Sequence, residues 1–252
     1  AWIASVPELT FTLFSLASLA LYIREDARPR PSWWPPWICF VLALLCKETA
    51  VTLVAVLAAY DLALRPRRTR QTPGMLVRRW LPYLATLVFY LIVRHRVLEA
   101  TQVRQGSLWD LTSLQLVLSA LDLFRQYLGA LLWPVDLNFW HTFEPVESLV
   151  SSAALQALAV AAAFALACGW AWKRDRRVAF GLALLILPLA PAFYIAALPA
   201  KPFAERYLYL PSAGFVLLAA LLFDRLAALP RMRLVAAGLV LAITASFAVA
   251  TV

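Results

Sequence analysis

Two short charged segments lie between apolar stretches and carry the side chains best suited to binding an anion. The first is Lys47-Glu48, between the apolar residues 33–46 and 49–64. The second, residues 201–211, ends in a proline and carries, in order, Lys201, Glu205, Arg206, Tyr207 and Tyr209. Arginine offers several planar donors to phosphate oxygens, and lysine adds a point charge. Tyrosine hydrogen-bonds a phosphate or stacks on a sugar. These residues predict a phosphate-binding site, with a charged turn and an anchoring loop as the structural alternatives.

The stretch around residues 99–148 supplies further polar candidates, of which Arg125 and His141 are kept as substrate-binding residues. His141 next to Trp140 is also typical of a residue at a membrane interface. The sequence has no His-Glu-x-x-His spacing, no Gly-rich phosphate loop and no Gly-x-Ser-x-Gly. Its cysteines, Cys39, Cys46 and Cys168, show no ligand spacing. We therefore expect no metal and no cofactor.

The elements that must position these residues are membrane helices. Hydrophobic residues make up 63% of the 252, and the mean hydropathy is +0.76, whereas a soluble domain has about 45–50% apolar residues. Apolar runs cover 8–23, 33–46, 49–64, 80–98, 114–133, 149–172, 178–199, 212–229 and 234–252. The pattern predicts an all-α polytopic transmembrane bundle that forms a single domain over residues 1–252.

Clusters of basic residues between the runs predict the orientation of the bundle. They comprise Arg24, Arg28 and Arg30; Arg65, Arg67, Arg68, Arg70, Arg78 and Arg79; Lys173, Arg174, Arg176 and Arg177; and Arg225, Arg231 and Arg233. Because cytoplasmic loops are enriched in Lys and Arg, we place all four clusters in the cytoplasm. They account for much of the net charge of +9, so we expect no nucleic-acid partner. Both charged segments then face the periplasm or exterior of an integral, multi-pass protein.

An even number of crossings must separate two cytoplasmic clusters. Residues 33–64 are therefore expected to form two short crossings that turn at Lys47-Glu48. The run 114–133 is expected to lie in the interface or re-enter, which leaves about eight crossings. That run has polar or small residues at helical spacing: Gln115, Ser119, Asp122, Gln126 and Gly129. The alternative for this run is an ordinary span whose polar stripe faces the bundle.

Several stretches resemble one family of membrane enzymes. They are Ala1-Trp2-Ile3-Ala4; residues 45–53, with Lys47-Glu48-Thr49, followed by Tyr60-Asp61-Leu62; Leu81-Pro82-Tyr83 with Arg94; Tyr127 through Pro134-Val135-Asp136-Leu137; and Ala204-Glu205-Arg206-Tyr207-Leu208-Tyr209-Leu210-Pro211. In this order they are similar to the transmembrane and tetratricopeptide-repeat O-mannosyltransferase family and its bacterial relatives, in the GT-C class of glycosyltransferases. Where the family has Gly-Arg-x-Asp, this chain reads Ser5-Val6-Pro7-Glu8, with Val6 in place of Arg.

The resemblance implies a reaction and roles for the candidate residues. A sugar would pass from a polyprenyl-phosphate carrier, the co-substrate, to a protein Ser/Thr or a glycan at the non-cytoplasmic face of a bacterial inner membrane. Arg206 and Lys201 would hold the carrier phosphate with Lys47 nearby, while Glu48 and Glu205 would orient these cations. The catalytic acid would precede Ala1, and tetratricopeptide repeats would follow the membrane part, so we expect the fragment alone to be inactive.

Two other functions remain open from the residues alone. A transporter or flippase of an anionic lipid-linked substrate would use similar basic groups, although such proteins often carry internal repeats and charges at mid-membrane, which are not evident here. A scaffold that only anchors further domains would need no polar aromatic segment such as residues 203–211.

The predicted orientation places Lys47-Glu48 and Glu205-Arg206 on the same side of the membrane. In a full-length variant without Cys39, Cys46 and Cys168, cysteines introduced as Glu48→Cys and Glu205→Cys should both react with an impermeant thiol reagent applied from the non-cytoplasmic side. Arg30→Cys should react only from the cytoplasmic side, because it lies in a basic connection. Labelling of Glu48→Cys and Glu205→Cys from opposite sides would contradict this orientation.

Overall fold

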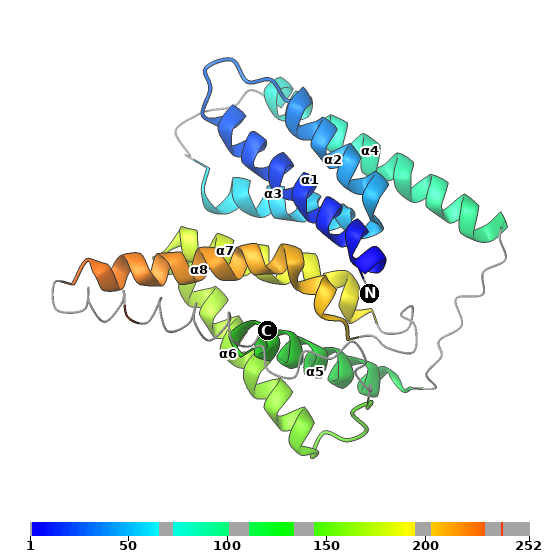
Figure 1. Ribbon diagram of the computed structural model, residues 1–252, viewed down its shortest axis with the longest axis vertical. Helices are drawn as coiled ribbons and strands as arrows, with labels where there is room; N and C mark the ends of the chain where they lie inside the picture. The colour runs from blue at the N-terminus through cyan, green and yellow to red at the C-terminus, as the bar shows by residue number, and fades with distance from the viewer. Residues whose placement is uncertain are drawn as a thin grey trace.

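The computed structural model describes residues 2–65, 73–100, 111–133, 144–194 and 203–229, together with residue 238, and every regular element within these ranges is helical (Figure 1). The α-helices are α1 (Trp2–Asp26), α2 (Trp34–Cys46), α3 (Thr52–Ala63), α4 (Pro73–Ala100), α5 (Ser113–Leu132), α6 (Ser152–Arg174), α7 (Arg176–Ile186) and α8 (Tyr209–Ala227). Short 3-10 helices are η1 (Glu48–Val51), η2 (Leu187–Phe193) and η4 (Glu205–Leu208). The predicted all-α class is confirmed for these residues.

The structure contains helical segments that are long and apolar enough to cross a membrane. Five such segments occur among the described residues: Val6–Asp26, Gly74–Glu99, Ser152–Arg174, Arg176–Phe193 and Glu205–Ala227. They identify an integral membrane protein. Helix α2 is apolar but shorter, and the run 234–252, apart from residue 238, lies outside the described residues. The expected total of about eight crossings therefore stays a prediction.

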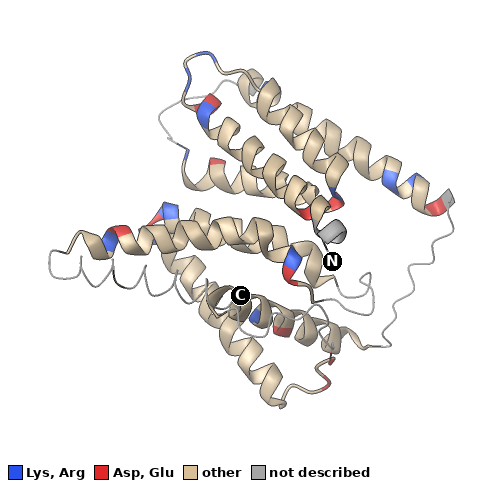
Figure 2. Ribbon diagram, in the orientation of Figure 1, with Lys and Arg blue, Asp and Glu red and all other residues tan. Residues whose placement is uncertain are grey.

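The exterior of the helices is apolar, as a lipid-facing surface must be. On α4, for example, Leu81, Val88 and Phe89 are all more than half exposed, and Phe89 reaches 69%. A water-soluble protein does not leave this much contiguous apolar surface uncovered. Charged residues lie mainly towards the helix ends, whereas the middle of most helices carries none (Figure 2).

Helices α1 to α4 share one core. Phe40, Leu53, Leu57, Tyr60 and Tyr83 are buried there, with Tyr22 of α1 among them. Helices α1 and α2 run antiparallel side by side, and Ser18 of α1 donates a 2.7 Å hydrogen bond to the carbonyl of Pro36. A second core joins α5 to α7, η2 and η4, where Tyr127 stacks on Phe203 at 4.7 Å.

The helical stretch 33–64 is interrupted where the sequence predicts it. Helix α2 ends at Cys46, and Lys47 is extended, with φ −159° and ψ 139°, before η1 and α3 continue the chain. The break brings the two charged residues to the end of the helix pair instead of burying them at mid-height, where a charge is costly. The predicted turn is thus confirmed, whereas membrane crossing by these two short helices stays a prediction.

The middle part of the polar stripe of α5 faces the protein. Ser119 and Asp122 are buried, and Ser119 accepts a 2.9 Å hydrogen bond from the backbone N–H of Val146. Leu114 and Val117 on the other side are exposed. The burial of Ser119 and Asp122 agrees with the alternative interpretation, in which the stripe faces the bundle. Helix α5 is nonetheless not among the five segments above, and its interfacial or re-entrant placement stays a prediction.

Helices α7 and α8 approach closely at two glycines. A Cβ placed on Gly214 of α8 would lie 2.5 Å from the backbone N of Leu185 and 2.8 Å from the carbonyl O of Gly181. Real Cβ atoms do not come this near to backbone atoms, so only glycine permits the contact. This contact holds the start of α8, and with it η4, against α7.

Gly214→Ala should therefore destabilise the fold. Forcing the two backbones apart should lower the free energy of unfolding by about 1–3 kcal/mol. Gly129→Ala on α5 is the matched control, because a Cβ there meets nothing within 4 Å. Unfolding in detergent, followed by circular dichroism, would measure both changes. Equal stability of the two variants would contradict the close contact.

Candidate functional site

The candidate site centres on Glu8, a carboxylate near the start of α1 that is only 4% exposed. Because α1 and α2 are antiparallel, the start of α1 lies beside the end of α2. The ammonium group of Lys47, just beyond α2, makes an ion pair with Glu8 Oε1. Both side chains are largely shielded, so removal of either partner would leave a poorly solvated charge.

Arg206 approaches the same carboxylate from η4, the short turn that leads into α8. Its Nε lies 3.7 Å from Glu8 Oε1. That distance is within ion-pair range but too long for a hydrogen bond. The Arg206 side chain is also 38% exposed, so its guanidinium keeps donors for a further acceptor.

Tyr207 completes what we call the Glu8 cluster, which comprises Glu8, Lys47, Arg206 and Tyr207. The Lys47 ammonium lies 4.5 Å from the centre of the Tyr207 ring, a cation–π distance. Tyr209 lines the same small pocket. The pocket volume is about 10 Å³, which is room for about one water molecule. Any larger ligand must therefore sit at its rim.

The cluster has an unbalanced charge. Two cations share the carboxylate of Glu8, so Glu8 alone does not balance both positive charges. Burial lowers the pKa of Lys47 below its usual value, while the ion pair with Glu8 acts against this shift. An anion bound nearby would favour the charged form of Lys47 further.

The structure brings together part of the set that the sequence predicts. Lys47, Arg206, Tyr207 and Tyr209 meet in one place. Glu205 opens η4 beside them. Lys201 and His141 lie outside the described residues.

Two predicted residues belong elsewhere. Glu48 pairs with Arg94 of α4, and the carboxylate that pairs with Lys47 is that of Glu8. Arg125 pairs with Asp122 one turn away on α5, at 2.7 Å, which separates it from the cluster. The Arg125–Asp122 pair is local to α5, whereas the Glu48–Arg94 pair joins η1 to α4 and forms because helix packing brings these two charges together.

Glu8 itself was not predicted as a site residue. In the sequence it opens an apolar run and occupies the fourth position of the divergent family-like stretch. The available signal was a lone carboxylate at the end of a membrane helix, since such a group needs a partner. Its partner is 39 residues away in the chain, and only helix packing reveals it.

A second group of charges, the Arg79 cluster, lies at the other end of α1, α3 and α4. The guanidinium of Arg79 is fully buried and contacts Asp26 and Asp61, each at 2.5 Å. It also lies over the rings of Tyr22 and Trp33, at 4.1 and 4.5 Å. The hydroxyl of Tyr22 donates to Asp61 at 3.0 Å.

Arg65 brings the Arg79 cluster into charge balance, because it lies 3.3 Å from Asp26. Two arginines then face two aspartates. Arg65 and Arg79 thus each form ion pairs with aspartates that hold the structure together, although both also belong to a basic connection. A balanced and enclosed cluster is suited to joining helices, not to binding a further anion.

Comparisons with known proteins add no family assignment. No protein-family model matches the sequence, and no curated protein and no solved structure gives a significant match.

Removing the Arg79 guanidinium should destabilise the helix bundle strongly. Arg79→Met keeps the bulk but leaves two shielded carboxylates without their main partner, and we expect unfolding to become easier by about 3–5 kcal/mol. Arg78→Ala is the matched control, because Arg78 is the adjacent residue on α4 but is exposed. Thermal unfolding in detergent would measure both variants. An Arg79→Met protein as stable as Arg78→Ala would show that the cluster does not hold the helices.

Proposed function

We propose that this chain is the membrane part of a glycosyltransferase that moves a sugar from a polyprenyl-phosphate carrier to an acceptor, a protein Ser/Thr or a glycan. The observation that carries the proposal is the Glu8 cluster, where two cations converge on a single carboxylate beside two tyrosines. The resemblance of residues 45–53 and 203–212 to GT-C enzymes agrees with it, since both segments contribute to this cluster.

The position of the cluster supports a reaction at the membrane surface. A polyprenyl carrier keeps its chain in the lipid and its phosphate at the interface, and the cluster lies at helix ends next to apolar, exposed helix faces. Among the described residues, Arg24, Arg65 and Arg225 lie at the opposite ends of α1, α3 and α8. By the positive-inside rule, we propose that the cluster is on the non-cytoplasmic side.

The geometry suggests different roles for the two cations. Arg206 is loosely held at 3.7 Å from Glu8 and partly exposed, so it is suited to forming bidentate hydrogen bonds with the carrier phosphate. Lys47 is enclosed and anchored by Glu8 and Tyr207. It contributes a fixed positive charge close to the phosphate.

In the proposed reaction the bond between the sugar and the carrier phosphate breaks, and the acceptor oxygen bonds to the sugar. The phosphate leaves with the electron pair and gains negative charge. Arg206 and Lys47 stabilise that charge, the kind of electrostatic effect that is often the largest in catalysis. Glu8 is held by two cations, so we assign it the positioning of Lys47. The acid that accepts the proton of the acceptor is proposed to come from outside residues 1–252.

Arg206→Ala should abolish sugar transfer in the full-length protein. We expect at least about a 100-fold loss of rate, the size seen when one donor to a developing negative charge is removed. Arg206→Lys should retain part of the activity, because it keeps the charge but not the planar donor pair. Release of radiolabelled sugar from its polyprenyl-phosphate carrier is the measurement.

Arg94→Ala is the control for this experiment. Arg94 lies on α4 and pairs with Glu48, apart from the Glu8 cluster, so its loss should leave transfer close to wild type. Wild-type transfer by Arg206→Ala would overturn the role of Arg206. Uptake or flipping of a lipid-linked solute in vesicles without any transfer would favour a transporter instead.

A further inference from the structure

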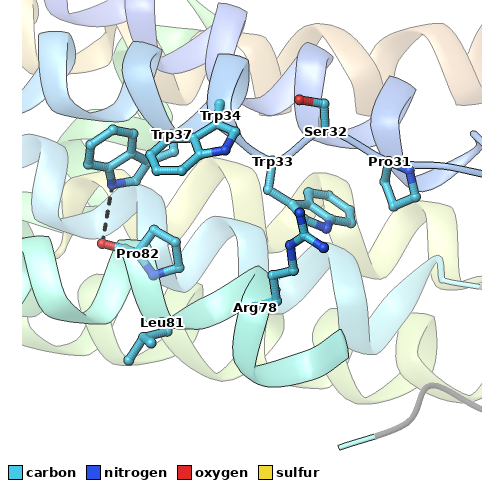
Figure 3. Close-up of a pocket in the computed structure, with 8 residues that line it drawn as sticks. All are labelled: Pro31, Ser32, Trp33, Trp34, Trp37, Arg78, Leu81 and Pro82. Atoms are coloured by element: carbon cyan, nitrogen blue, oxygen red, sulfur yellow. Dashed lines mark hydrogen bonds between the residues drawn. The ribbon is translucent and has the colours of Figure 1, made fainter. Parts of the chain in front are cut away.

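A separate pocket lies near the Arg79 cluster, between the segment that leads into α2 and the first turns of α4 (Figure 3). Its volume is about 450 Å³. The polar side of the lining consists of Ser32, Trp33, Trp34, Trp37 and Arg78, and the remaining lining residues are apolar. The pocket is thus far roomier than the one beside Glu8.

Some of the hydrogen-bond donors that line the pocket have no acceptor among the described residues. Arg78 makes no ion pair with any residue that the structure describes, and its side chain lies next to the Trp33 ring in Figure 3. The indole N–H of Trp37 is satisfied by Pro82 O at 3.2 Å and Thr86 Oγ1 at 3.0 Å. Within the described ranges, the indole N–H groups of Trp33 and Trp34 have no such acceptor, and both remain donors.

The carboxylates near the pocket are already occupied. Glu25 pairs with Arg28 and accepts a 2.8 Å hydrogen bond from the backbone N–H of Ser32. Asp26 is held by Arg79 and Arg65. None of the described residues that line the pocket is acidic, so the charge of Arg78 is available to an anion from outside.

An apolar track leads away from the pocket along α4. Leu81, which lines it, is followed by Leu84 and Val88, and all three are exposed. Residues at i, i+3 and i+7 lie on one face of a helix. A ligand with an anionic head and long apolar tails therefore matches both parts of this surface.

We propose that this pocket binds the headgroup of an anionic phospholipid. The phosphodiester accepts hydrogen bonds from the Arg78 guanidinium and from the indole N–H groups of Trp33 and Trp34. The acyl chains lie along Leu81, Leu84 and Val88. The site is at the end of the bundle opposite to the Glu8 cluster and does not depend on the proposed transferase reaction.

The test uses the full chain purified in detergent and native mass spectrometry to measure lipid binding. Phosphatidylglycerol is the anionic probe, phosphatidylcholine the zwitterionic probe and inorganic phosphate the free anion. We expect Arg78→Ala to weaken phosphatidylglycerol binding by at least about tenfold, since a hydrogen bond to a charged group is lost. Trp34→Phe keeps an aromatic ring, although a smaller one, removes one donor and should weaken binding less.

Arg24→Ala is the matched control, because Arg24 is an exposed arginine at the same end of the bundle but outside the pocket. It should bind phosphatidylglycerol as the wild type does. Equal losses in Arg24→Ala and Arg78→Ala would show a general surface-charge effect and overturn the proposal. Equally tight binding of phosphatidylcholine, or displacement of the lipid by equimolar inorganic phosphate, would overturn it as well. A wild-type unfolding curve for Arg78→Ala confirms that a loss of binding is local.

Discussion

The ion pairs of Arg79 with Asp26 and Asp61 are the interaction on which the arrangement of the N-terminal helices depends. They join α1, α3 and α4 at one end, next to the apolar core that these helices share with α2. The attraction within a shielded ion pair offsets the cost of removing both charges from water only while the charges stay close. Such a pair therefore resists displacement of the helices that carry it. Once the positions of the helices are fixed at this end, their rigidity limits where their other ends can lie.

Helix geometry carries that constraint across the bundle. Glu8 and Asp26 are separated along α1 by 18 residues, about 27 Å at 1.5 Å per residue. That length is close to the roughly 30 Å of a bilayer hydrocarbon core. The Arg79 cluster holds one end of α1, and Glu8 lies towards the other end, where the antiparallel packing of α1 and α2 brings it beside Lys47.

The two ends differ in a way that bears on function. The Arg79 cluster balances two arginines with two aspartates and is enclosed by aromatic rings. The Glu8 cluster has two cations for one carboxylate and one loosely held arginine. Charge balance stabilises a structure, whereas an excess positive charge with spare donors is available to a ligand. The same contrast separates Arg78, which faces an open pocket, from its buried neighbour Arg79.

The sequence by itself determined the features that depend on local chemistry. Apolar runs of membrane length and the break at Lys47 follow from residue type and order. Partner choice was decided only by the tertiary structure. Glu8 pairs with Lys47, which is 39 residues away in the sequence, and Arg79 pairs with Asp26, which is 53 residues away. Charge patterns reveal that shielded charges need partners, but several partners are equally suitable until packed helices bring one pair within contact distance.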